Sequence, residues 1–143
     1  MKAETLRLEG VGLLLFSDKG RLLVLRELES KPFISKELGM LTFPLETIEL
    51  GESPQCALGR LMTEEVGTIN VHSTYQFQSL EFIHPECIVK IYTYVSRVDN
   101  EFIANPADND VLHYGWMTPE QLLVHAHKRI EVSPIIGAYL NQT

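Results

Sequence analysis

Acidic and basic side chains gather in the segment 51–67, which reads GESPQCALGRLMTEEVG. Arg60 and Glu64 are four residues apart and would share one face of a helix, and Glu65 follows directly. Magnesium prefers oxygen ligands and is held by a few carboxylates together with water and substrate phosphates. The spacing is therefore compatible with a divalent-metal site, to which Glu52 could also turn, although a helix with one Arg–Glu pair and two terminal glutamates is also common as a purely structural element.

Local signals place these residues on a helix. Ser53 is a good N-cap and Pro54 suits the first helical position, so we expect a helix that runs to about Val66 and stops at Gly67. Gly59 in its interior costs about 1 kcal/mol relative to alanine. This glycine marks either a close backbone approach or a sequence change without structural significance.

Short apolar runs before and after this helix predict strands, because they are rich in branched residues or alternate in polarity. A polar turn, His84-Pro85-Glu86, divides the last two runs, and we give its side chains little weight as site residues because turns are polar anyway. The predicted extended segments are Gly10–Phe16, Arg21–Arg26, Met40–Glu49, Gln76–Ile83 and Ile88–Val98.

Two further helices and two loops complete the expected organisation. Thr118-Pro119-Glu120-Gln121 predicts a helix with a capping box, and Ser133-Pro134 begins a last helix that extends to about Leu140. Glu27–Gly39 and Asn105–Asp110 are polar and predict loops. Strands and helices in this order indicate an α/β protein with helices packed on a mixed sheet. Because no linker divides the chain, we expect a single domain over 1–143.

Composition narrows the class of partner and the location. The net charge is −7 and the 12 basic residues are scattered, which argues against a nucleic acid polymer as partner. The apolar runs are too short to span a bilayer and the first ten residues show no signal peptide, so we expect no membrane association. Cys56 and Cys87 predict neither disulfides nor zinc, and we expect free thiols in a cytoplasmic protein, with Cys56 buried on its helix.

The stretch Glu52–Gly67 resembles the signature of the Nudix hydrolase family, G-x5-E-x7-R-E-U-x-E-E-x-G-U, in which U is a bulky aliphatic residue. The similarity extends to 12–26 and to 116–122, and so covers most of the chain. The positions that match at the signature's spacing are Glu52, Arg60, Met62, Glu64, Glu65 and Gly67.

The resemblance implies a Nudix-like α/β/α sandwich with a mixed β-sheet, which binds Mg²⁺ or Mn²⁺. It implies hydrolysis of a small nucleotide-derived substrate, a nucleoside diphosphate linked to another moiety, and leaves a homodimer open. Glu64 and Glu65 would be metal ligands, and the carbonyl of Leu45 would add an oxygen. Arg60 would orient Glu49 or Glu52.

Three positions depart from the signature. Leu45-Glu46 replaces a glycine pair, Thr68 stands at the last aliphatic position, and Leu61 follows Arg60 where the family has a glutamate. Leucine can neither bind a cation nor accept a proton. Glu46 could return an acid to the site, although its direction cannot be predicted from the sequence.

The base could instead come from a later loop, since an acid or histidine near neutral pKa would serve. The candidates are Asp108, Asp110 and His113, and the expected catalytic set is Glu52, Arg60, Glu64 and His113. A divergent metal-dependent hydrolase is therefore the favoured interpretation. The alternatives are a catalytically impaired Nudix-fold module that binds a nucleotide or a protein partner without turnover, and a purely structural domain.

Overall fold

The computed structural model describes residues 5–67 and 70–142, so Thr68 lies outside the described residues. In chain order the strands are β1 (Leu6–Phe16), β2 (Leu22–Glu27), β3 (Leu41–Thr42), β4 (Leu45–Thr47), β5 (His72–Ile83), β6 (Cys87–Arg97) and β7 (Val111–Met117). The helical segments are a 3₁₀ turn η1 (Pro32–Ile34), α1 (Pro54–Leu61), a π-helical turn η2 (Met62–Val66), α2 (Pro119–Leu123) and α3 (Val132–Asn141).

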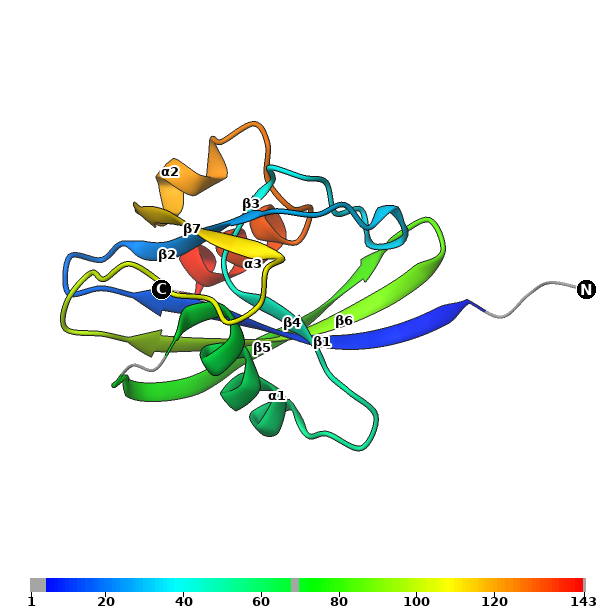
Figure 1. The fold of residues 1–143 in the computed structure, drawn as a ribbon, viewed down its shortest axis with the longest axis horizontal. Coiled ribbons are helices and arrows are strands. Elements are labelled where there is room, and N and C mark those ends of the chain that lie inside the picture. Colours follow the sequence, from blue (N-terminus) through cyan, green and yellow to red (C-terminus); the bar gives the residue numbers. More distant parts are fainter. Residues whose placement is uncertain (1–4, 68–69, 143) are drawn as a thin grey trace, which may run out of the picture.

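The strands form one seven-stranded mixed sheet in the order β3-β2-β1-β6-β5, with β4 also paired to β1 and β7 to β2 (Figure 1). The long pair β1–β6 is parallel from Leu6–Cys87 to Phe16–Arg97, and the other pairs are antiparallel. Every residue of β1 from Gly10 to Phe16 is buried, as a central strand covered on both faces requires.

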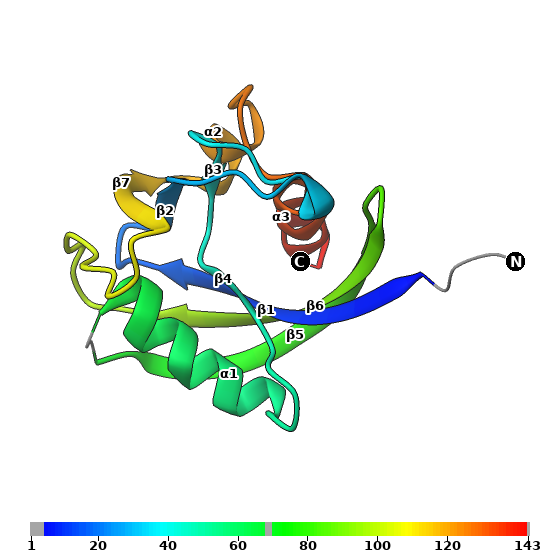
Figure 2. The same cartoon turned by 45° about the vertical axis from the view of Figure 1, so that its right-hand side comes forward.

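Helices cover both faces of this sheet. Figure 2 shows α1 against one face and α2 and α3 on the other. Successive side chains of β1 point to opposite faces. Leu13 and Leu15 therefore pack with α1 and its Leu61, whereas Leu14 and Phe16 pack with α2 and α3. The α/β/α sandwich with a mixed sheet, expected from the resemblance, is confirmed.

Local signals predicted the ends of α1 and α2, whereas α3 begins at Val132 with Glu131 as its N-cap and not at Ser133. The Ser53 hydroxyl accepts the amide of Cys56 at 3.1 Å, and the helical segment runs through η2 to Gly67, whose φ is 106°. Thr118 and Gln121 form the predicted capping box at α2. A Cβ at Gly59 would meet open space, so this glycine does not mark a close backbone approach.

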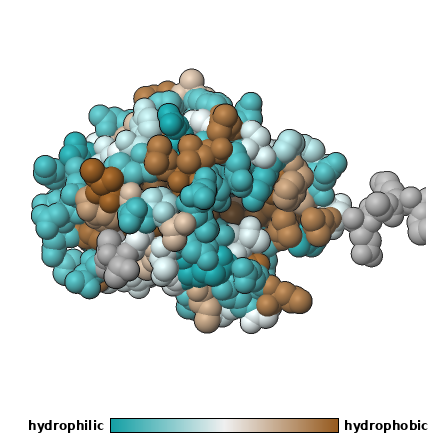
Figure 3. All heavy atoms as spheres, viewed as in Figure 1, coloured by the Kyte–Doolittle hydropathy of each residue, from teal (hydrophilic) through white to brown (hydrophobic). Residues whose placement is uncertain are grey.

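One burial prediction is wrong. Cys56 is exposed, because the buried positions of α1 are Ala57, Leu58 and Leu61, whereas Cys87 is buried as a free thiol. None of the helices within residues 5–67 and 70–142 has the length and apolar character needed to cross a bilayer. In the view of Figure 1, the surface is mostly polar, with separate apolar patches between the polar side chains (Figure 3).

Candidate metal centre and adjoining pocket

Arg60, near the end of α1, organises the acidic side chains. Its Nε donates to Glu52 Oε2 at 3.1 Å and its Nη2 to Glu52 Oε1 at 2.9 Å, a two-pronged pair. The same Nη2 donates to the carbonyl of Thr47 at 2.6 Å. The hydrogen bonds from Arg60 lower the pKa of Glu52. Arg60 therefore holds Glu52, one of the two partners expected from the sequence.

The other terminal nitrogen of Arg60 faces two further carboxylates. Nη1 lies 3.2 Å from Glu64 Oε2 and 3.3 Å from Glu46 Oε1. Glu49, the second expected partner, is 3.9 Å away and largely exposed. One guanidinium thus sets the positions of acids from β4, the α1 approach and η2, because a planar group with five donors can bond several carboxylates at once.

Glu46, Glu64 and Asp108 form a compact carboxylate cluster, which we call the metal cluster. One oxygen from each lies within 4.8 Å of the others. Packing these acids together raises the pKa of both Glu46 and Asp108, through burial and through the nearby Glu64. A divalent cation would relieve this repulsion with the oxygen ligands that Mg²⁺ and Mn²⁺ prefer, so the residues fit such a metal.

The π-helical turn explains how Asp108 reaches the cluster. The carbonyl of Glu64 in η2 accepts the amides of Ala107 at 2.8 Å and Asp108 at 3.3 Å, and the carbonyl of Val66 accepts Asn105 at 3.1 Å. These carbonyls lie at a helix end, where intrahelical partners run out. The loop before β7 is therefore docked through backbone atoms, which the residue types alone do not reveal.

Glu65 and Leu45 contact each other. The group of Leu45 that takes part is its amide N–H, and not the carbonyl that was expected to bind a metal. Glu65 is 3% exposed and its Oε1 accepts that amide at 3.0 Å. Burial first, and then the charge of Glu46, raise the pKa of Glu65 well above its ordinary value. Glu65 lies in the wall of the pocket described below, next to the metal cluster.

His113 bonds the backbone of a neighbouring loop, and Leu61 packs in the core. His113 Nδ1 accepts the amide of Ala104 at 3.0 Å, and burial lowers the pKa of its ring. Its ring thereby holds the loop that follows β6. Leu61 is fully buried in the core between α1 and the sheet. The position that carries a glutamate in the signature is here part of the core.

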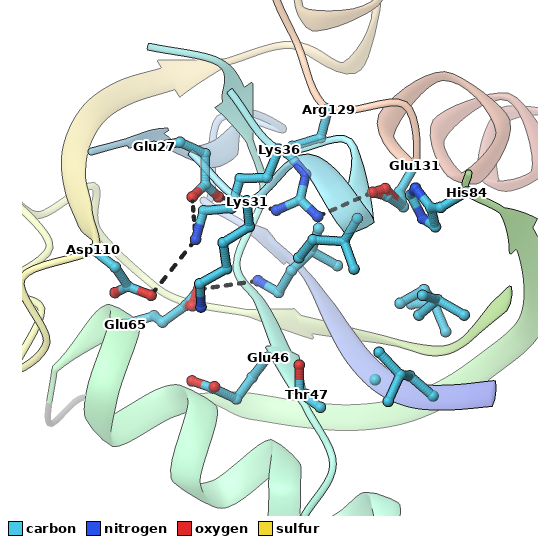
Figure 4. A pocket seen from close by; sticks show the side chains of 16 residues that line it. Glu27, Lys31, Lys36, Glu46, Thr47, Glu65, His84, Asp110, Arg129 and Glu131 are labelled. Carbon is cyan, nitrogen blue, oxygen red and sulfur yellow. Dashed lines mark hydrogen bonds and ion pairs between the residues drawn. The ribbon is translucent and has the colours of Figure 1, made fainter. Parts of the chain in front are cut away.

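A pocket begins at Glu46 and Glu65 and extends away from α1 across the sheet (Figure 4). Apolar side chains of β1 and β6 form one wall, and polar side chains from several loops form the other. The apolar wall includes Leu8, Val89 and Ile91, and the polar wall includes Glu27, Lys31, Lys36, His84, Asp110, Arg129 and Glu131.

The polar wall is a chain of buried ion pairs that sequence analysis did not find. Lys36 Nζ lies 2.9 Å from Glu27 Oε2 and 3.8 Å from Asp110. Arg129 links the other Glu27 oxygen, at 3.3 Å, to Glu131, at 3.2 Å. In a sequence these residues look like ordinary surface charges, because nothing local marks a charged side chain as buried.

The pKa of Glu46, raised to about 7, gives a prediction for the metal-free protein. Its ordinary value is 4.5, so between these values the folded state binds more protons than the unfolded state. The free energy of unfolding must then fall as pH rises through this window. In EDTA, we expect a higher Tm at about pH 5.5 than at about pH 7.5. Glu46→Gln should flatten this dependence, and an unchanged slope in that variant would contradict the assignment.

Comparisons with known proteins agree with the fold. Residues 6–135 match the family model for the NUDIX domain. DR0079 from Deinococcus radiodurans shares 22% identity and a TM-score of 0.74, over 95% of this chain and 85% of that one. The MutT protein from Methanosarcina mazei Go1 shares 17% identity and a TM-score of 0.75, over 99% and 100%.

A third similar structure contains a ligand. The NUDIX domain of Shewanella oneidensis NrtR, complexed with ADP ribose, shares 16% identity and a TM-score of 0.75, over 100% of this chain and 91% of that one. At these identities the likeness shows the fold alone. No curated protein matches the chain at a significant level.

Proposed function

The chain belongs to the Nudix family, and from this premise we propose that it is a divalent-metal-dependent hydrolase. Its substrate would be a nucleoside diphosphate linked to another moiety. The observation that carries the proposal is the metal cluster, in which Glu46, Glu64 and Asp108 converge and Arg60 forms ion pairs with Glu46 and Glu64. Glu46 and Asp108 supply the carboxylates that Leu61 cannot.

Glu46, Glu64 and Asp108 would hold the cation, with Glu65 beside them. When bound, the cation would neutralise the diphosphate and activate a water molecule. Arg60 fixes the directions of Glu46 and Glu64, so the ligands need little reorganisation. Asp108 is the exposed member of the cluster and so the one most open to an incoming water, and we assign it the proton of the attacking water.

The ligand of a similar domain supports the substrate class. ADP ribose, held by the Shewanella domain, is a nucleoside diphosphate linked to a sugar. The pocket beside Glu46 and Glu65 would take one end of such a molecule while the diphosphate lies at the metal cluster. A cytoplasmic location, a single domain and a homodimer are predictions that stand beside this proposal.

One observation favours the alternative of a binding module without turnover. Leu61 is fully buried against the sheet, so the position that carries a glutamate in the signature is here an apolar core position. Such a module would keep the metal cluster and the pocket and bind its ligand without hydrolysing it. Turnover and binding must therefore be measured separately.

The first experiment is a calorimetric titration of the protein with Mn²⁺ and Mg²⁺. We expect Asp108→Asn to weaken binding by about tenfold or more, because removing a ligand should cost at least as much as removing a second-shell partner. Asp18→Asn, an exposed change in the β1–β2 turn, is the matched control and should leave binding unchanged.

A panel of nucleoside diphosphate derivatives then separates the two functions. Metal-dependent release of a nucleoside monophosphate from at least one derivative supports the hydrolase. Binding of metal and nucleotide without product across the panel supports the binding module. If neither wild type nor Asp18→Asn binds metal, with or without a non-hydrolysable nucleotide, the metal cluster has been misassigned.

A further inference from the structure

The pocket joins the metal cluster to a buried ion pair. Glu46 and Glu65 line its near end, while Arg129 and Glu131 line its far wall (Figure 4). A ligand whose diphosphate lies at the near end would extend one of its two ends, the nucleoside or the other moiety, toward Arg129 and Glu131. The inference below therefore rests on the proposed function and concerns which group that is.

Arg129 and Glu131 each keep one polar atom unused. They are 7% and 1% exposed. Arg129 donates through Nη1 to Glu27 and through Nη2 to Glu131 Oε1. Among the described residues that line the pocket, the buried side-chain atoms without a hydrogen-bond partner are Arg129 Nε, Glu131 Oε2, Glu27 Oε2 and Asp110 Oδ1. A buried donor and a buried acceptor without partners cost free energy until a bound molecule satisfies them.

The charges of this wall are already balanced. Two buried cations, Lys36 and Arg129, face two buried anions, Glu27 and Glu131. A further anion or cation placed here would be a buried charge without a counterion, which is strongly unfavourable. The occupant that fits is neutral and offers both an acceptor and a donor.

The opposite wall suits a flat ring. It consists of Leu8 and Gly10 of β1 and Val89 and Ile91 of β6. A Cβ at Gly10 would lie 3.0 Å from the Ile91 side chain and 3.1 Å from the carbonyl oxygen of Glu46. Glycine at this position therefore lets β1 pack closely against β4 and β6 at the near end of the pocket.

We infer that the pocket selects a guanine-type base, with a ring carbonyl beside a ring N–H, through Arg129 and Glu131. Arg129 Nε, the unpaired N–H, would donate to the ring carbonyl oxygen O6 of guanine, a position at which adenine carries an amino donor in place of an acceptor. The Glu131 carboxylate would accept from the ring N–H and the neighbouring amino group. The pocket thus favours a guanosine over an adenosine diphosphate derivative.

The test measures binding of non-hydrolysable α,β-methylene diphosphates of guanosine, inosine and adenosine, with Mn²⁺ present. Guanosine should bind about 10- to 100-fold more tightly than adenosine, the discrimination that a good pair of base contacts provides. Inosine keeps the carbonyl and ring N–H and should stay close to guanosine. This comparison needs no variant, so a misfolded mutant cannot obscure it.

A double variant tests the residues. Arg129→Gln with Glu131→Gln removes one cation and one anion together, so neither is left as an unpaired buried charge. We expect it to bind both nucleotides, with the preference for guanosine reduced to less than threefold. The matched control is Arg7→Gln with Glu81→Gln, which removes an exposed ion pair and should keep the preference.

Equal binding of guanosine and adenosine analogues by wild type, or tighter binding of adenosine, would overturn the inference. A preference that survives in the folded double variant would overturn the assignment to these two residues. Selective binding without any turnover of the natural diphosphates would leave the inference standing and refute the hydrolase. Turnover without a preference between guanosine and adenosine would support the hydrolase and refute the base selectivity.

Discussion

Glu64→Gln is expected to lower kcat/KM for any turned-over substrate by about 10³-fold, or about 4 kcal/mol of transition-state stabilisation. The Glu64 carboxylate accepts a hydrogen bond from Arg60 at 3.2 Å, while the Glu64 main-chain carbonyl docks the loop of Asp108. Glutamine keeps the shape and removes the charge. The side-chain ligand is lost, but the backbone docking of the loop is not.

The measurement is steady-state hydrolysis with saturating Mn²⁺, accompanied by an unfolding curve for the variant. Glu120→Gln, an exposed change at the start of α2, is the matched control and should keep full activity. Full activity in a folded Glu64→Gln protein would show that catalysis does not depend on the metal cluster. Reduced activity that returns at higher metal concentration would place the loss in metal affinity.

Leu61→Glu, the change that restores the family signature, is expected to destabilise the fold by about 3–5 kcal/mol without restoring a ligand. Leu61 is fully buried among the apolar side chains between α1 and the sheet. A carboxylate introduced there would have no counterion and would leave apolar contacts unfilled. Since domains are stable by only about 5–15 kcal/mol, this loss would be large.

Urea unfolding followed by circular dichroism measures this prediction. Leu61→Met is the matched control, because it conserves volume and should cost less than about 1.5 kcal/mol. A Leu61→Glu protein that is as stable as wild type and turns over faster would show that the side chain at this position reaches the metal cluster. In that case α1 would have to rotate relative to the sheet.

Local chemistry made α1, α2 and most of the strands predictable, whereas β7 was not among the extended segments predicted from local patterns. The Ser53-Pro54 start and the Thr118 capping box depend on neighbouring residues only, and both are confirmed. The family signature added the sandwich architecture. Cys56 shows the limit of such reasoning, because its exposure depends on which face of α1 turns to the sheet.

The metal cluster needed information that the chain does not carry locally. Glu46 was recognised as an acid of unknown direction, and Asp108 as one of several candidates for the base. Their meeting with Glu64 depends on the pairing of β4 with β1 and on the docking of a loop onto η2. The turn position of His84 gives no sign of a site residue, yet His84 is buried in the pocket wall and its Nδ1 lies 3.0 Å from the Ser35 hydroxyl.

The parallel pairing of β1 with β6 has a consequence for synthesis and folding. β1 can pair early with β2 and β4, but its long parallel partner β6 begins only at Cys87, so a nascent chain that ends before Cys87 cannot complete the centre of the sheet. Such long-range pairing slows folding toward the millisecond-to-second range. Arg129 and Glu131 follow β6 in the chain, so the nascent chain would acquire the proposed nucleotide selectivity only after the central strand pair has been made.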